Sequence, residues 1–226
     1  MEDAIANRMI TYYTLFTQMR VKGGNDYIEF IKSILEARDF LYELVVASWY
    51  RNAGYDIDFD FAKKTDVVAK GNNNLYIECK RLKSTNGYEK NYRKACKQLM
   101  QVERCDNEIS LVYVDVYNCI SSIVPRYEYK NITHIKDTVD RAMKFGFEKD
   151  NLTITNRLLN EYKENVDGIV FTTVANYAIN TPLMMEIEFY IGQDVHLYKD
   201  ISDDRFSLIK NALKNVGYKI HQGIES

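Results

Sequence analysis

Two short apolar runs around a turn segment constrain the fold of this chain more than any other feature. Residues 67–69 and 75–79 each have the length of a strand, and a Gly-Asn-Asn-Asn segment lies between them. Because glycine and asparagine tolerate positive φ, this stretch predicts a β-hairpin. Residues 86–104 then repeat apolar side chains at helical spacing, and residues 109–116 are rich in β-branched side chains. A hairpin followed by a helix and another strand indicates an α/β fold with a mixed sheet.

The rest of the chain continues this pattern, and no internal repeat divides it. Further helices are predicted over residues 5–19, 26–54, 138–147, 153–165 and 203–215, and further strands over residues 55–61, 168–173 and 184–191. We therefore expect a single domain with a central mixed β-sheet flanked by helices. Its expected parts are an N-terminal helical region (1–38), a core that carries the motifs described below (39–120), a helical insertion (121–166) and C-terminal strands with a helix (167–226).

The overall charge excludes a strongly basic nucleic-acid binder. The 226 residues include 30 Lys and Arg against 32 Asp and Glu, which gives a net charge of −2. Any binding to a polyanion must therefore come from a local patch. The longest uncharged run, residues 168–185, contains asparagine and proline that a membrane-spanning helix rarely carries, so no membrane insertion is expected.

The cysteines and the start of the chain predict a cytoplasmic protein. Four cysteines occur singly, without the closely spaced pairs that indicate a zinc module, and they suggest no disulfide framework. The first residues lack the basic region and the apolar core of a signal peptide. Both features favour a reducing cytosol.

Charged side chains on the predicted hairpin are the strongest candidates for chemistry. Side chains alternate along a strand, so Glu78 and Lys80 point to the same face, about 7 Å apart at their Cα atoms. A hairpin loop with an odd number of residues would place Asp66 directly across from Glu78, whereas an even loop without a bulge would point it away. Two facing carboxylates repel unless a cation or a proton lies between them, and oxygen ligands favour Mg²⁺ or Mn²⁺. The alternative is a solvated strand face in which Lys80 forms a surface salt bridge.

Glu43 is a third candidate acid. It is the one charged residue between Asp39 and Arg51, in an otherwise largely apolar helical run. A carboxylate buried there without a partner is costly. Glu43 either faces the metal or lies on a narrow solvated stripe with Asp39 and Glu36.

Together these residues resemble the PD-(D/E)XK nuclease superfamily, whose members share a restriction-endonuclease-like fold. The pattern consists of Glu43, Asp66 and the segment Glu78-Cys79-Lys80. The resemblance implies that Glu43, Asp66 and Glu78 bind Mg²⁺ or Mn²⁺, with the backbone carbonyl of Cys79 as a further ligand. It also implies that Asp66, Glu78 and Lys80 are the catalytic residues and that the sheet has a restriction-endonuclease-like core.

The resemblance covers about a quarter of the chain, over residues 40–99, and beyond them only the order of strands and helices agrees. Thr65 stands where the name of the motif has proline, which is not a ligand. Many members carry glutamine or a basic residue on the helix that follows, and Gln98 occupies a similar place.

A local excess of positive charge adjoins the predicted site. Residues 80–97 contain seven basic side chains and one acidic side chain. Several of the basic residues share the polar face of the predicted helix, where contacts with phosphates would need them. The residues expected to bind the substrate are Arg81, Lys90, Arg93, Lys94, Lys97 and Gln98. The simpler alternative is a basic helix face that is only solvated.

The sequence therefore predicts a nuclease that uses Mg²⁺ or Mn²⁺ and a metal-activated water to hydrolyse phosphodiester bonds, in DNA rather than RNA. One alternative is a nuclease fold retained as a nucleic-acid-binding or interaction module with weak or no catalysis. Another is an RNA endonuclease. Endonucleolytic or exonucleolytic action stays open, and so does the oligomeric state, including a homodimer. His134, His196 and His221 match no catalytic pairing and are expected in surface or packing roles.

Overall fold

The computed structural model of this chain has one mixed sheet with helices on both faces, which confirms the predicted α/β class with a central mixed sheet. The described residues are 37–59, 65–124, 129, 131–180, 185–216 and 219–222. The helix predicted over residues 5–19, the first part of the helix predicted over 26–54 and the end of the strand predicted over 55–61 lie outside them. None of the helices in the described ranges combines the length and the apolar composition that a membrane crossing requires.

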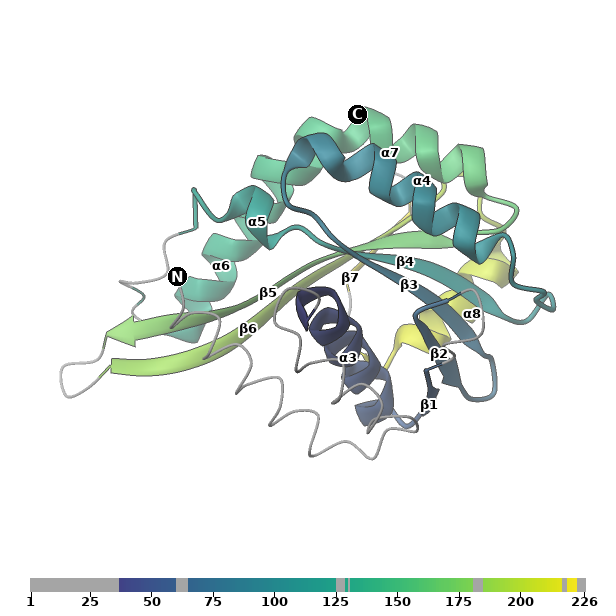
Figure 1. Ribbon diagram of the computed structural model, residues 1–226, viewed down its shortest axis with the longest axis horizontal. Helices are drawn as coiled ribbons and strands as arrows, with labels where there is room; N and C mark the ends of the chain where they lie inside the picture. The colour runs from purple at the N-terminus through teal and green to yellow at the C-terminus, as the bar shows by residue number, and fades with distance from the viewer. Residues whose placement is uncertain are drawn as a thin grey trace.

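Helices and strands follow one another along the described chain as Figure 1 shows. The helices are α3 (Ala37–Asn52), α4 (Tyr88–Leu99), α5 (Tyr117–Ile120), α6 (Ile132–Met143), α7 (Lys149–Tyr162) and α8 (Asp203–Leu213), with a 3₁₀ turn at Thr85–Gly87 and a π-helical turn at Lys144–Glu148. The strands are β1 (Asp56–Asp58), β2 (Val67–Lys70), β3 (Leu75–Arg81), β4 (Ile109–Asp115), β5 (Gly168–Asn180), β6 (Met185–Leu197) and β7 (Lys219–Gln222).

The seven described strands form one sheet, and their order in the sheet is their order in the chain. β3, β4 and β5 run parallel to one another, β6 and β7 are also parallel, and the remaining neighbours are antiparallel. β1, β2 and β3 therefore form an antiparallel meander at one edge of the sheet. β3, the inner strand of this meander, pairs with both β2 and β4.

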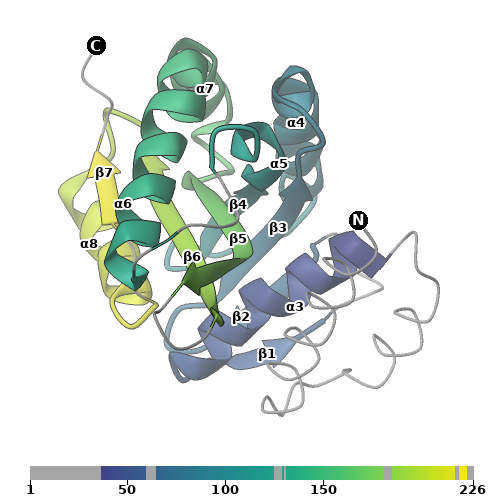
Figure 2. The same cartoon turned by 90° about the vertical axis from the view of Figure 1, so that its left-hand side faces the viewer.

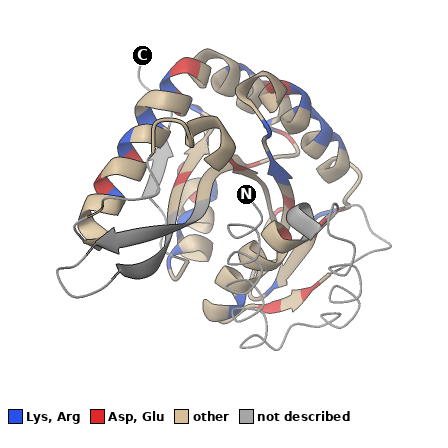
Figure 3. Cartoon of the chain, turned by 60° about the vertical axis from the view of Figure 1, so that its left-hand side comes forward, with Lys and Arg blue, Asp and Glu red and all other residues tan. Residues whose placement is uncertain are grey.

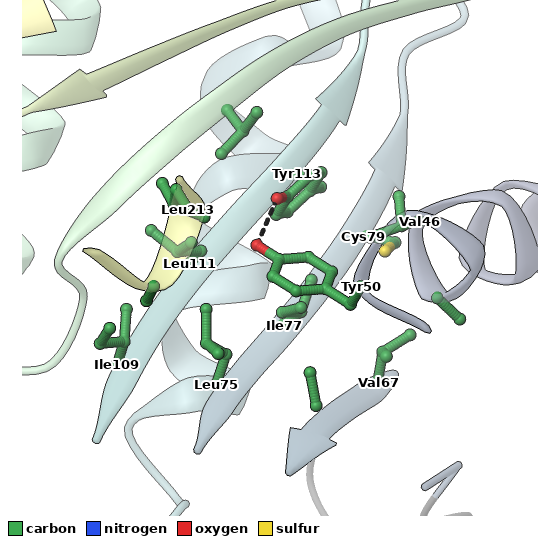
Figure 4. Close-up of a cluster of buried hydrophobic side chains, with 14 of the residues drawn as sticks. Val46, Tyr50, Val67, Leu75, Ile77, Cys79, Ile109, Leu111, Tyr113 and Leu213 are labelled. Carbon is green, nitrogen blue, oxygen red and sulfur yellow. Dashed lines mark hydrogen bonds between the residues drawn. The ribbon is translucent and has the colours of Figure 1, made fainter. Parts of the chain in front are cut away.

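The sheet separates two apolar cores (Figure 2). α3 and α8 cover one face, which carries Leu75, Ile77 and Cys79 of β3. α4, α5, α6 and α7 cover the other face. Figure 4 shows part of the first core, where the hydroxyls of Tyr50 on α3 and Tyr113 on β4 form a 2.5 Å hydrogen bond. Because the side chains of β3 alternate, Glu78 and Lys80 belong to the face opposite α3.

α3 is buried around most of its circumference rather than along one stripe. Residues 41–50 are all buried except the partly buried Trp49. A helix that is apolar on nearly all sides belongs to the interior of a protein. A charged side chain within residues 41–50 must therefore find partners inside the protein, and Glu43 is the one charged residue there.

α4 has the predicted amphipathic character. Its buried side chains are Tyr88, Tyr92, Ala95, Cys96 and Leu99. They pack against the second core, so the basic side of the helix faces outward. α4 thus presents the local positive charge on the same side of the sheet as Glu78 and Lys80.

Candidate metal and catalytic site

Asp66, Glu78 and Lys80 meet where β2 pairs with β3. Val67 is paired with Ile77, and continuing this register by one residue places Asp66 across from Glu78, as an odd loop requires. Lys80 Nζ lies 2.8 Å from Glu78 Oε2 and 3.4 Å from Asp66 Oδ2. The three side chains form one cluster, which we call the hairpin site.

Backbone contacts hold Asp66 in place within the hairpin site. The amide N–H of Cys79 donates to Asp66 Oδ2 at 2.8 Å. One residue earlier, the buried Thr65 donates its hydroxyl to the carbonyl oxygen of Ile77 at 2.8 Å. Threonine at the place of the motif's proline thus fastens the start of β2 to β3. Both bonds restrict where the Asp66 carboxylate can point.

Glu78 is the most perturbed group of the hairpin site. Its side chain is fully buried, and its Oε1 atom has no hydrogen-bond partner among the described residues. Burial and the facing Asp66 carboxylate raise the pKa of Glu78 to about 8, although Lys80 opposes this change. Burial by itself would lower the pKa of Lys80, but the two carboxylates raise it well above its usual value. One ammonium group is therefore not enough to keep both carboxylates ionised at neutral pH.

Glu43 lies on α3 and is only 8% exposed, so it is not part of a solvated stripe. Burial raises the pKa of the Cys79 thiol well above its usual value, and the carboxylates of Asp66, Glu43 and Glu78 raise it further. Glu43 thus contributes to the negative potential near the end of β3. Among the described residues, Glu43, Asp66 and Glu78 do not form a group whose ligand atoms all lie within 4.8 Å of one another. A group that does consists of Glu148, Asp194 and His196. Direct metal ligation by Glu43 and by the Cys79 carbonyl stays a prediction.

Arg81 is held inside the protein. Its side chain is 7% exposed, and its Nε lies 2.9 Å from Oδ2 of the buried Asp115 on β4. Asp115 also accepts a hydrogen bond from the amide of Tyr117 at 3.0 Å, just beyond the end of β4. The ion pair ties the end of β3 to β4 beside the hairpin site. This placement favours a structural role for Arg81, which the sequence analysis assigned to substrate binding.

The other predicted substrate contacts differ in accessibility. Lys90, Lys94 and Lys97 are exposed on the outer side of α4, along which Figure 3 shows basic residues. Arg93 instead bonds Glu89 at 3.0 Å and also pairs with Glu161 of α7. Gln98 is half-buried, and within the described part of the chain its buried Oε1 has no hydrogen-bond partner. The three lysines are therefore the accessible cations on this helix.

The structure also contains a group that the sequence analysis missed. Glu148, Asp194 and His196 each offer one ligand atom, and these atoms lie within 4.8 Å of one another. His196 has the packing contact that was expected, because its ring centroid lies 5.2 Å from that of Phe171. The spacing of Asp194 and His196 on one strand was a usable signal for a shared face. Nothing local connects them to Glu148, which comes from the π-helical turn.

A comparison of the chain with protein-family models, curated proteins and solved structures finds no match. Two carboxylates that face each other beside an ammonium group can bind a hard divalent cation and place a hydrogen-bond donor next to it. Metal-assisted phosphoryl transfer to water uses both functions.

Proposed function

We propose that this chain is a nuclease that uses Mg²⁺ or Mn²⁺ to hydrolyse phosphodiester bonds in DNA. The observation that carries the proposal is the placement of the Asp66 and Glu78 carboxylates around Lys80 Nζ, which lies 3.4 Å from Asp66 Oδ2 and 2.8 Å from Glu78 Oε2. The buried Glu78 Oε1 has no hydrogen-bond partner among the residues that the structure describes. Carboxylates in this arrangement are stable together only with a cation or a proton between them. Their oxygen chemistry fits Mg²⁺ or Mn²⁺.

The order of the elements supports the same proposal. α3, the β1–β3 meander, α4 and β4 follow one another as the resemblance to the restriction-endonuclease-like core implies. In that order, the helix that carries Glu43 precedes the hairpin, and the basic helix follows it. The resemblance and the geometry of the hairpin site thus point to the same residues.

The residues of the hairpin site have distinct roles in this mechanism. Asp66 and Glu78 supply carboxylate oxygens to the cation, and Glu43 adds negative charge from α3. A bound divalent ion would polarise a phosphoryl oxygen and lower the pKa of a coordinated water. Lys80, kept protonated by its two carboxylate neighbours, donates hydrogen bonds that orient the attacking water and offset charge on the phosphate.

The substrate assignment rests on the exposed lysines of α4. A chain of net charge −2 attracts a polyanion only through a local patch, and Lys90, Lys94 and Lys97 form one on the sheet face that also carries Glu78 and Lys80. Phosphate contacts of this kind carry no sequence information. We therefore expect binding that depends strongly on salt and little on base sequence.

Cleavage of plasmid DNA, single-stranded DNA and RNA in Mn²⁺ or Mg²⁺ tests the proposal. Asp66→Asn and Lys80→Ala should each lower the rate at least about 100-fold, because each removes a group that acts in the transition state. Lys70→Ala is the matched control. Lys70 lies in the same hairpin and pairs with Asp58 at 2.7 Å, but it is exposed and outside the hairpin site. This variant should cleave at the wild-type rate.

The outcomes separate the proposed function from its alternatives. Cleavage that survives both Asp66→Asn and Lys80→Ala rules the mechanism out. Salt-sensitive DNA binding without metal-dependent cleavage would instead favour a binding module that keeps the nuclease fold. Cleavage of RNA alone would favour an RNA endonuclease.

A further inference from the structure

Glu148, Asp194 and His196 form a second group of metal-binding side chains, on a different part of the sheet from the hairpin site. Glu148 ends the π-helical turn between α6 and α7, whereas Asp194 and His196 lie two residues apart on β6. Val195 between them belongs to the core under α3 and α8, so Asp194 and His196 share the opposite face, which α6 and α7 cover. The group therefore joins the predicted helical insertion to the sheet.

The spacing within the group suits a small cation. His196 Nε2 lies 3.4 Å from Glu148 Oε2. Two ligands of a tetrahedral Zn²⁺ ion, each bound at about 2.0–2.1 Å, lie about 3.3 Å apart. The Glu148–His196 pair already has this spacing, and Asp194 offers a third ligand atom within 4.8 Å of the other two.

Burial distinguishes this group from an ordinary acidic cluster on a surface. The side chains of Glu148 and His196 are 9% and 4% exposed. Within the described ranges, Glu148 Oε1 is buried and has no hydrogen-bond partner, which is costly for a carboxylate. Glu148 also sits in a π-helical turn, and such single turns between α-helices occur frequently at functional sites. A cation bound by the Glu148 carboxylate would offset this cost.

We propose that Glu148, Asp194 and His196 bind Zn²⁺ and that the ion fastens the turn between α6 and α7 to β6. An imidazole ligand favours a transition metal over Mg²⁺ or Ca²⁺, and a set without thiolate or thioether disfavours Cu⁺. Three protein ligands leave a fourth position for water. Because the ligands come from two separate parts of the chain, the binding free energy adds to the stability of the folded protein. The proposal does not depend on nuclease activity.

Titration of Zn²⁺ into the whole chain carrying Asp66→Asn tests the proposal, because this substitution removes a ligand of the hairpin site. Calorimetry and the melting temperature report binding, with Mg²⁺ as the comparison ion. We expect one Zn²⁺ per chain and a rise in melting temperature of about 5–10 °C at a hundredfold excess over the dissociation constant. Adding His196→Gln or Asp194→Asn should weaken Zn²⁺ binding at least about tenfold. His134→Gln, which removes an exposed histidine of α6, should leave it unchanged.

Circular dichroism establishes that each variant folds. If His196→Gln does not fold, Asp194→Asn decides the question, because Asp194 is only partly buried. Absence of Zn²⁺ binding to the Asp66→Asn protein would leave Glu148 and His196 as a buried ion pair and overturn the proposal. Zn²⁺ binding that the substitutions at positions 194 and 196 do not weaken would place the ion elsewhere and also overturn it.

Discussion

Replacing Glu78 by glutamine should change how the stability of the metal-free protein depends on pH. The pKa of Glu78 is about 8 in the folded protein, against an ordinary value of 4.5. An acid whose pKa is raised by folding binds more protons in the folded than in the unfolded state between these two values. Its stabilising contribution is therefore fully present below pH 4.5 and is lost as the pH rises toward 8.

The size of this effect follows from the same two values. Each pH unit in the interval removes about 1.36 kcal/mol, so the loss between pH 4.5 and pH 7 is about 3 kcal/mol. Glutamine does not ionise, and its amide can donate a hydrogen bond to Asp66. The free energy of unfolding of Glu78→Gln minus that of the wild type should therefore rise by about 3 kcal/mol between pH 4.5 and pH 7.

Urea denaturation at a series of pH values, with EDTA present, measures this difference. Glu103→Gln is the control, because it removes one exposed carboxylate from the surface. The reasoning is refuted if the difference between wild type and Glu78→Gln is independent of pH. A difference that moves in favour of the wild type as the pH rises would also refute it.

Three further predictions concern the ion pair beside the hairpin site, the turn after α3 and the basic face of α4. Asp115→Asn should lower the free energy of unfolding by about 3–5 kcal/mol in urea denaturation, because Arg81 stays buried and charged; wild-type stability would contradict this. Gly54→Ala should cost about 1–2 kcal/mol in thermal unfolding, because φ is 96° there although nothing lies within 4 Å of the added Cβ; an unchanged melting temperature would contradict this. Combined alanine substitution of the exposed lysines should reduce the slope of the logarithm of the DNA association constant against the logarithm of salt concentration by about 3, as measured by fluorescence anisotropy. An unchanged slope would place the DNA elsewhere. These lysines are Lys90, Lys94 and Lys97.

The central elements could be predicted because their patterns are local. The hairpin, the strand over residues 109–116 and the helix of α4 all appear within a few residues of their predicted places. The predicted helix over residues 86–104 is longer than α4, which ends at Leu99, because no glycine or proline marks its end. β7 was missed because Ile220 is its one apolar residue, so that it shows neither an apolar run nor an alternation.

The length of β5 and β6 could not be predicted from apolar spacing. The strands predicted over residues 168–173 and 184–191 become thirteen residues each, paired from Gly168 with Leu197 to Asn180 with Met185. Backbone hydrogen bonds hold the outer half of this ribbon. Such bonds form with any side chain except proline, so the sequence pattern does not record them.

In the candidate sites, too, local patterns predict some of the residue contacts, and the tertiary fold alone creates the others. Alternation along a strand is a local property, and it was enough to place Glu78 and Lys80 on one face. Asp66 joins them because the hairpin loop is odd, which the sequence left open and the register of β2 and β3 decides. Arg81 looked like a substrate contact because its partner, Asp115, lies on the next parallel strand, beyond α4. The Glu148–His196 contact likewise depends on how the π-helical turn packs on β6. Pairings of this kind follow from the tertiary fold, and a single sequence does not contain them.

Calorimetric titration of Mn²⁺ at pH 7 tests most directly whether Asp66 and Glu78 form a cation site. Because burial and the Asp66 carboxylate raise its pKa to about 8, Glu78 is mostly protonated in the metal-free protein at this pH and must lose the proton on coordination. Titrations in buffers of different ionisation enthalpy should give close to one proton released for each ion bound there, and Asp66→Asn should remove this binding event. Mn²⁺ binding without proton release, or binding that neither Asp66→Asn nor Glu78→Gln alters, would contradict the account.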